Sequence, residues 1–426
     1  MLVRLCAAFA ALAGAAAKAP HLVFVLVDDL GFNDGHDSSD IGSIAWPKTN
    51  ALANEGLRIE HYYTQPICTP TRGALMSGRY PARLGLSHQV IQGYQNYGLP
   101  LDEVTLADKL RSSGYKTYAT GKWHLGCYSF ASTPTYRGFD RYFGYWNGAE
   151  DYTTHEIGGY LDLHRQNGTA HVQAADARGK YSTPIFAADV IDALQTHKRD
   201  FPDAPGFFYF PLQNVHAPME SPGGEYDAVC AGVSDTGRQT FCAMAAIADD
   251  AIGNVTDALS RLYADEDFLV VIAGDNGGIA QWSGNNAPLR GQKGTLWEGG
   301  VRNNALVWGS LLPKSARGST YSDGLVHVTD WHATFAALGG ATLAGVHCLQ
   351  PLRQTLTLLP PPTVEVVHCL PRMRAAADVS RAFFLCECRA FPSRPRRQRW
   401  TEWTCGAQSP PRHPTSRRPA RGRSSS

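Results

Sequence analysis

The chain has 426 residues, of which 43% are hydrophobic, and is long enough to bury a large core. We expect either more than one domain or one large α/β domain with an appendage. The net charge of +1 gives no electrostatic reason to expect a nucleic-acid partner, so we predict none.

The first 17 residues have the layout of a cleavable secretory signal. Arg4 lies in a short basic start, an apolar run follows, and small residues gather around Ala15 and Ala17. We therefore predict a signal peptide at 1–17 and entry into the secretory pathway, with export and the lysosome both open as destinations. An Ala-rich N-terminal helix is the alternative. No other apolar stretch approaches the roughly 18 residues of a membrane span, so none is predicted.

A continuous apolar run at 21–27 indicates a strand buried on both faces of a sheet. It ends in Asp28 and Asp29, and in α/β sheets ligands lie beyond the carboxyl ends of the strands. Two adjacent carboxylates repel each other and lose hydration there, which is tolerable if a divalent cation sits between them. The alternative is a solvated turn.

Cys68 opens a stretch of helical character that runs to Arg79. Pro70 fits a first helical turn, so Cys68 should lie near the helix N-terminus. Unpaired N–H groups and partial positive charge at that end suit a nucleophile that works on an anion. The alternative is an ordinary buried cysteine before a turn.

The order Cys68-Thr69-Pro70-Thr71-Arg72, followed by Ser77-Gly78-Arg79, resembles the signature of the type I sulfatases. In that family a formylglycine-generating enzyme oxidises the cysteine to formylglycine, whose hydrate is the nucleophile. The resemblance implies a sulfuric ester hydrolase with one calcium ion, bound by Asp28, Asp29 and the modified Cys68. The flanking segments are most similar to the arylsulfatase B (N-acetylgalactosamine-4-sulfatase) subgroup, namely 61–66, 83–89, 137–145 and 148–156.

Short helices are predicted at 49–56 and 104–113, and a strand at 115–120 leads into the hexapeptide 121–126. Alternation in an extended segment would put Lys122 and His124 on one side. In isolation, a surface lysine and a partly buried histidine would be the ordinary interpretation. The hexapeptide is a second sulfatase hallmark. The resemblance implies that Lys122 holds the nucleophile and the sulfate oxygens, and that His124 hydrogen-bonds the formylglycine hydroxyl.

Two further buried-strand runs, 206–213 and 268–273, lead into polar residues. The first is followed by His216, which the resemblance makes the group that protonates the departing oxygen. The second is followed by Asp275 and Asn276. Their oxygens would complete an oxygen-only shell with Asp28 and Asp29, which suits a hard cation rather than zinc. A plain turn is the alternative.

The remaining segments extend the same pattern. Residues 288–302 match the family's late motif, in which Lys293 binds the sulfate group, and 328–338 indicate a helix. An amphipathic helix is predicted at 241–259, with Asn254 on its exposed face. Cys230 and Cys242 bracket a short loop and could pair. Two sequons, at Asn167 and Asn254, are compatible with glycosylation.

From about residue 340 the chain becomes rich in Cys, Pro and Arg. We predict a catalytic domain at 18–340 and a largely disordered tail at 341–426, in place of the small C-terminal antiparallel-sheet domain of the family. Strands that alternate with helices over 21–340 indicate an α/β fold with a mainly parallel sheet sandwiched by helices. The resemblance makes it alkaline-phosphatase-like.

The predicted function is hydrolysis of sulfate esters on a sulfated carbohydrate, such as a sulfated sugar or a glycosaminoglycan-like polysaccharide. One alternative is a phosphate or phosphonate monoester hydrolase of the same superfamily, because the two kinds of ester share geometry. The other is a catalytically inert secreted protein that binds sulfated glycans.

Overall fold

The structure is a computed structural model that describes residues 18–35 and 39–341. The predicted signal segment 1–17 lies outside the described residues. So does the predicted tail apart from residue 341, and with it the prediction that the small C-terminal domain is missing or replaced. The domain boundary near residue 340 stays a prediction.

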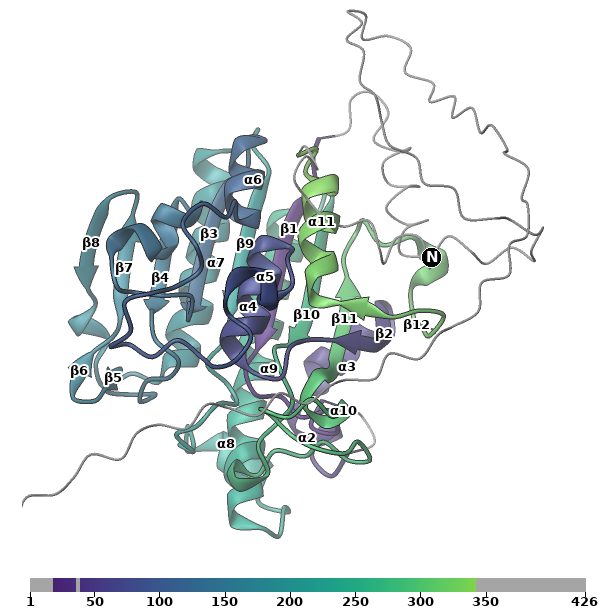
Figure 1. Cartoon of the computed structure of the whole chain (residues 1–426). Coiled ribbons are helices and arrows are strands. Elements are labelled where there is room, and N and C mark those ends of the chain that lie inside the picture. Colours follow the sequence, from purple (N-terminus) through teal and green to yellow (C-terminus); the bar gives the residue numbers. More distant parts are fainter. Residues whose placement is uncertain (1–17, 36–38, 342–426) are drawn as a thin grey trace, which may run out of the picture. The chain divides into compact units, whose positions relative to one another are not determined.

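An eleven-stranded mixed sheet forms the centre of the described chain (Figure 1), in the order β12-β2-β11-β10-β1-β9-β3-β4-β7-β8, with β13 also paired to β2. The five strands from β10 to β4 in that order are mutually parallel. Antiparallel pairs join β11 to β10, β2 to β11, β7 to β4 and β8 to β7. The strands are β1 (His21–Val27), β2 (Leu57–Tyr63), β3 (Lys116–Lys122), β4 (Arg141–Tyr145), β7 (His164–Asn167), β8 (Ala170–Gln173), β9 (Gly206–Pro211), β10 (Phe268–Gly274), β11 (Arg302–Trp308), β12 (Ser319–Tyr321) and β13 (Val326–His327). A separate hairpin joins β5 (Glu156–Ile157) to β6 (Tyr160–Leu161).

Helices cover both faces of the sheet, and the side chains of β1 divide between two cores. Leu22, Phe24 and Leu26 pack with α4 (Cys68–Ser77), α6 (Leu106–Ser112) and α11 (Val328–Leu338). The alternate valines 23, 25 and 27 pack with α7 (Ser182–Asp200) and α9 (Thr236–Leu262), together with α2 (Gly42–Ala45) and α3 (Pro47–Glu55). Shorter helices are α5 (Pro81–Leu84), α8 (Glu225–Val229) and α10 (Glu298–Val301). The predicted α/β sandwich with a mainly parallel centre is confirmed.

The predicted elements agree closely with the structure where a strand or helix is strongly apolar. The strand at 21–27 and the helix at 328–338 match β1 and α11 end for end. The predicted helix at 241–259 is longer, because the side chain of Asp235 accepts a hydrogen bond from the backbone N–H of Arg238 and starts α9 at Thr236. As predicted, Asn254 is exposed on that helix, and Asn167 is exposed at the end of β7.

The extended conformation expected through His124 is wrong. Strand β3 ends at Lys122, and His124 adopts a left-handed backbone with φ of 55°. The alternation of side chains along a strand therefore does not determine the relative directions of the Lys122 and His124 side chains.

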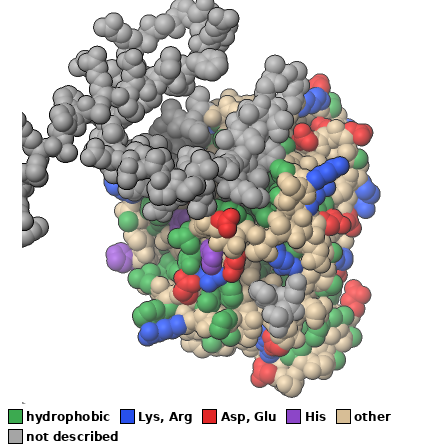
Figure 2. Space-filling model, turned by 90° about the vertical axis from the view of Figure 1, so that its right-hand side faces the viewer, with side chains coloured by type: hydrophobic (Ala, Val, Ile, Leu, Met, Phe, Trp, Pro, Cys, Tyr) green, Lys and Arg blue, Asp and Glu red, His purple; other side chains and the backbone are tan. Residues whose placement is uncertain are grey.

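Cys230 and Cys242 form a disulfide that joins the end of α8 to α9, as the loop between them suggested. Within the described residues, no helix combines the length and the apolar character that a membrane crossing needs. Figure 2 shows one face of the molecule, where acidic and basic side chains are scattered among apolar ones and neither sign forms a continuous patch.

Candidate active site

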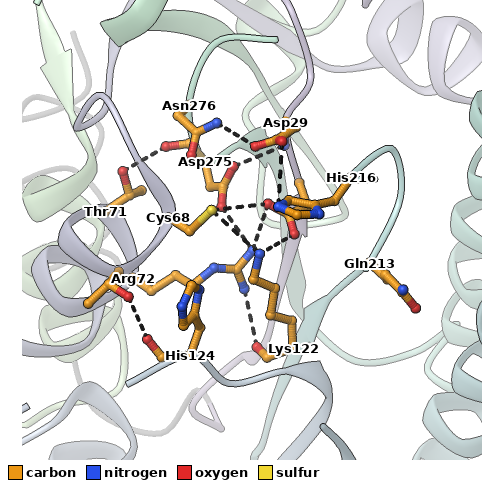
Figure 3. Close-up of polar contacts among 12 residues, drawn as sticks. Asp29, Cys68, Thr71, Arg72, Lys122, His124, Gln213, His216, Asp275 and Asn276 are labelled. Atoms are coloured by element: carbon orange, nitrogen blue, oxygen red, sulfur yellow. Dashed lines mark hydrogen bonds and ion pairs between the residues drawn. The ribbon is translucent and has the colours of Figure 1, made fainter. Parts of the chain in front are cut away.

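The predicted site residues meet at the carboxyl ends of four adjacent parallel strands, β10, β1, β9 and β3. Asp28 follows β1, Lys122 ends β3, His216 lies beyond β9, and Asp275 follows β10. The N-terminus of α4 brings Cys68 to the same place (Figure 3). This is the edge of an α/β sheet at which ligands bind.

Cys68 is the first residue of α4 and is 1% exposed. Its Sγ lies 3.4 Å from Lys122 Nζ and 3.6 Å from Asp28 Oδ1. Burial acts to raise the pKa of the thiol, but the charges of Lys122 and Lys293 outweigh burial and lower the pKa to about 6. The two lysines therefore favour the ionised form of the side chain at position 68.

Arg72, one turn along α4, ties this helix to the strand ends. Its Nη2 donates to Asp275 Oδ2 at 2.9 Å, and the same atom lies 3.5 Å from Asp28 Oδ1. Its Nη1 donates to the carbonyl oxygen of Lys122 at 3.2 Å. Burial acts to lower the pKa of Arg72, but the two carboxylates raise it well above its ordinary value. The guanidinium thus stays charged without contact with water.

Three cations face three carboxylates in this pocket. Besides the pair of Arg72 and Asp275, Lys122 Nζ lies 2.5 Å from Asp28 Oδ2, and Lys293 Nζ lies 2.6 Å from Asp29 Oδ1. Burial acts to raise the pKa of Asp29, but Lys293 and other neighbouring cations hold it below its ordinary value. Burial and the charge of Asp28 raise the pKa of Asp275 to about 6. A divalent cation among these groups would make the pocket net positive, as an anionic substrate requires.

The donor set fits such a cation. One ligand atom from each of Asp28, Asp29, Cys68 and His216 lies within 4.8 Å of the other three. Asn276 Nδ2 donates to Asp29 Oδ1 at 2.7 Å, while Asn276 Oδ1 is buried and has no hydrogen-bond partner among the described residues. A buried amide oxygen without a partner beside clustered carboxylates suits a hard cation such as Ca²⁺. His216 joins this cluster although the sequence did not suggest it as a ligand.

His216 is the most exposed of these side chains, at 18%. Its Nδ1 donates to the carbonyl oxygen of Ala217 at 2.6 Å, which leaves Nε2 facing Asp29 Oδ2 at 3.7 Å. Burial acts to lower the pKa of His216, but Asp29 outweighs it and raises the pKa above its ordinary value. This histidine can therefore carry a proton on Nε2 near neutral pH.

His124 has the opposite character. Its Nε2 donates to the carbonyl oxygen of Ile91 at 3.0 Å, and its Nδ1 is buried without a hydrogen-bond partner among the described residues. Burial lowers the pKa of His124 well below its ordinary value, and the charges of Lys122 and Arg72 act in the same direction. The ring is neutral, and Nδ1 is available to accept a hydrogen bond.

Sequence reasoning missed several residues that position this site. The hydroxyl of Thr71 donates to the carbonyl oxygen of Asp275 at 2.7 Å, and that of Thr69 donates to the carbonyl oxygen of His124 at 3.0 Å. Both threonines lie within the signature, so their place in the first turn of α4 was a usable signal. Gln213, by contrast, points away from the cluster in Figure 3 and donates to the carbonyl oxygen of Glu150.

A second missed group holds the loop that carries Asp29. Asp34 Oδ2 accepts the backbone N–H groups of Gly31 at 3.0 Å and of Asn285 at 2.9 Å. Asp34 Oδ1 accepts from Arg238 Nη1, which also donates to the carbonyl oxygen of Ser283 at 2.8 Å. The loop after β1 is thereby fixed to the segment that leads to Lys293. Nothing local in the sequence marks Arg238 as the partner.

Known proteins of similar sequence match most of this chain. The chain is 40% identical to arylsulfatase J of Mus musculus over 326 residues, which are 75% of this chain and 52% of that protein. It is 32% identical to arylsulfatase A of Homo sapiens over 360 residues, which are 78% of this chain and 66% of that protein. The chain thus spans about half to two thirds of the length of these relatives. They do not single out the arylsulfatase B subgroup, so that finer likeness stays a prediction.

Solved structures agree on the fold. The crystal structure of Ps i-CgsB in complex with k-i-k-neocarrahexaose superposes with a TM-score of 0.68 at 28% identity, covering 76% of this chain and 73% of that one. A protein in the alkaline phosphatase superfamily from Vibrio parahaemolyticus gives a TM-score of 0.50 at 17% identity, covering 76% of this chain and 67% of that one, and shows the fold alone. The alkaline-phosphatase-like fold is therefore confirmed.

The sequence profile described as Sulfatase matches residues 20–341, which include all ten residues of the predicted site. With this match over most of its length, the chain belongs to the sulfatase family, as its signature around Cys68 predicted.

Proposed function

We propose that this chain hydrolyses sulfate esters on sulfated sugars or glycosaminoglycan-like polysaccharides. The observation that carries the proposal is the position of Cys68 in a buried pocket, with Lys122 Nζ at 3.4 Å and Asp28 Oδ1 at 3.6 Å. The buried cations Arg72 and Lys122, the partly buried Lys293 and an oxygen-rich cluster surround it, in a chain that belongs to the sulfatase family. Such a pocket suits an anionic ester and the negative charge that grows on its oxygens during cleavage.

Two groups complete the proposed site. Cys68 is converted to formylglycine by a formylglycine-generating enzyme in the secretory pathway. One Ca²⁺ would be held by Asp28, Asp29, Asp275, Asn276 and the modified residue 68. The hydrated aldehyde would supply the nucleophile, with a second hydroxyl that neither serine nor cysteine has, and the ion would supply positive charge for an anionic ester.

The chain's own residues bind the ester and move the protons. Lys122 and Lys293 bind sulfuryl oxygens through Nζ, and each already sits against a carboxylate that orients it. Arg72 orients the first turn of α4 and so aims residue 68. His216 gives the proton on Nε2 to the departing sugar oxygen, because its ring is the most exposed of the site side chains and its pKa is raised.

His124 acts on the other side of the nucleophile. Its Nδ1 has no other hydrogen-bond partner among the described residues, and its ring is neutral. It therefore accepts the proton of the hydroxyl at residue 68 that expels sulfate. The buried position of the ring, at 3% exposure, keeps bulk water from competing for that atom.

The cellular setting is part of the proposal. The signal-like segment and the exposed sequons at Asn167 and Asn254 fit a glycoprotein that is secreted or delivered to the lysosome. The solved relative in complex with k-i-k-neocarrahexaose supports a carbohydrate as the substrate class.

The proposal is tested on the full chain produced in a secretory host. Turnover of p-nitrophenyl sulfate is compared with turnover of p-nitrophenyl phosphate, and the peptide containing Cys68 is analysed by mass spectrometry. We expect sulfate to be preferred and the mass to show conversion of thiol to aldehyde, with Cys68→Ala as the inactive control. Preference for the phosphate would favour a phosphoesterase. Unmodified Cys68 in soluble, inactive protein would favour the inert glycan-binding alternative.

A further inference from the structure

Arg290 and Trp297 form a stacked pair beside the pocket, on the loop that carries Lys293. The Arg290 guanidinium carbon lies 3.6 Å from the centre of the Trp297 ring. Both side chains are exposed, Trp297 at 51%. Leu296, which precedes Trp297 in the chain, is also exposed, at 84%. This loop therefore presents a cation and apolar surface to the solvent together.

The backbone under the pair is fixed. The N–H of Gly299 donates to the carbonyl oxygen of Arg290 at 2.7 Å and closes the loop at its base. A Cβ at Gly299 would come within 2.3 Å of the Gly291 carbonyl oxygen, so only glycine permits this close approach. Gly291 has φ of 89° and packs against Trp297. The stacked pair thus rests on a preorganised turn.

The pair is close along the chain to Lys293, whose Nζ contacts Asp29. Lys293 is three residues from Arg290, and three residues of chain span at most about 11 Å between Cα atoms. The backbone N–H of Gly294 donates to the carbonyl oxygen of Pro66, two residues before Cys68. This limit keeps the pair within reach of a sugar that neighbours the one carrying the scissile sulfate.

Arg290 differs from the other cations near Cys68 in its ion pairing. Arg72, Lys122 and Lys293 each sit against a carboxylate. Arg290 forms no ion pair with any carboxylate of the part of the chain that the structure describes, and the face of its guanidinium rests on the indole. Its edge, which carries the N–H donors, remains available for a planar or tetrahedral oxyanion.

Sugar rings stack on aromatic side chains through their apolar faces, and an arginine fork binds sulfate or carboxylate oxygens. We propose that Arg290 and Trp297 form a second subsite, which binds an anionic group on the sugar next to the one that carries the scissile sulfate. The substrate would then be a polysaccharide with closely spaced anionic groups rather than an isolated sulfated sugar. This inference rests on the proposed function and narrows its substrate class.

The test compares disaccharides that share the scissile sulfate and differ in the second sugar, which is neutral, sulfated or a uronic acid. For the unchanged enzyme we expect kcat/KM to be about tenfold or more higher with either anionic second sugar, the range that one charged hydrogen-bonded contact supports. Arg290→Gln should remove that preference, and Arg290→Lys should keep only part of it because lysine lacks the fork. Arg261→Gln, a change at an exposed arginine in the last turn of α9, is the matched control.

Binding provides a readout that does not need turnover. Calorimetric titration of the Cys68→Ala protein should show the same preference for an anionic second sugar, and adding Arg290→Gln should abolish it. Equal affinity for all three disaccharides, or a preference that survives Arg290→Gln, overturns the subsite. Absence of sulfatase turnover in the unchanged enzyme with a preference in titration would refute the proposed function and leave the subsite standing. If sulfate and uronic acid differ, the favoured one identifies the anion.

Discussion

Replacing Arg238 with glutamine should destabilise the protein through Asp34, which is fully buried. Arg238 contacts Asp34 through Nη1, and it holds Asp40 with hydrogen bonds of 2.9 and 2.7 Å. The substitution removes the charge that balances the Asp34 carboxylate, while Asp40 is left 51% exposed and hydrated.

Two terms set the size of the effect. Breaking a buried ion pair by removing one partner costs about 3–5 kcal/mol. Asp34 keeps two backbone N–H donors, from Gly31 and Asn285, which reduces that cost. The half-exposed pair with Asp40 adds about 0–1 kcal/mol. We therefore expect the free energy of unfolding to fall by about 2–4 kcal/mol near neutral pH.

The loss of unfolding free energy caused by Arg238→Gln should depend on pH. Burial raises the pKa of Asp34 to about 6 in the folded chain, above the ordinary value of 3.8, even with Arg238 present. The folded state therefore holds this proton more tightly than the unfolded state, so the contribution of Asp34 to stability is full below about pH 4 and is lost as pH rises through about 6. Without Arg238 the pKa rises further. The deficit of Arg238→Gln should be larger at pH 8 than at pH 5.

Urea unfolding at the two pH values measures the effect, with Asp40→Asn as the control for the exposed half of the network. Adding Asp34→Asn to Arg238→Gln should recover part of the stability at pH 8, because no buried charge then remains. A deficit below about 1 kcal/mol, or one equal to that of Asp40→Asn, would refute the reasoning, since exposed ion pairs contribute no more than that.

Three further outcomes are expected. His216→Gln should lower kcat by about 10²–10⁴-fold on a sugar sulfate but much less on p-nitrophenyl sulfate, whose leaving group departs without a proton; equal losses on both substrates would contradict the proton-donor role. Removing divalent ions with a chelator should abolish turnover and lower the midpoint of thermal unfolding. Adding calcium at about 100 times its dissociation constant should raise the free energy of unfolding by about 2.7 kcal/mol. An unchanged midpoint would argue against a structural ion. Thr71→Val should cost about 1–3 kcal/mol in urea unfolding because the Asp275 carbonyl oxygen loses a buried donor, whereas Thr71→Ser should cost less.

Much of the fold could be predicted because the central strands are buried on both faces. Such strands are apolar along their whole length, so β1, β9 and β10 stand out in the sequence and end near their first polar residue. Their carboxyl ends lie side by side in the sheet, which is why Asp28, His216 and Asp275 meet as expected.

What escaped prediction depends on contacts between distant parts of the chain. Asp34 and Arg238 are 204 residues apart, and an arginine near the start of a helix carries no mark of the carboxylate it will meet. The backbone of His124 could not be inferred either, because the alternation of a strand says nothing about the residue at which the strand ends. Local sequence patterns thus predicted the strands and helices, whereas contacts such as that of Asp34 with Arg238 depend on the packing of the whole fold.

Under the proposed function, the burial of Cys68 sets an order of events for maturation. All ten residues of α4 are buried, and the thiol is 1% exposed, so no second enzyme can reach it in the finished fold. Under the proposed function, conversion of this residue to formylglycine would take place while the polypeptide is still open, in competition with the collapse of the sheet around it. A molecule that closes first is sealed with an ordinary thiol, and the active fraction of a preparation then records which of the two processes was faster.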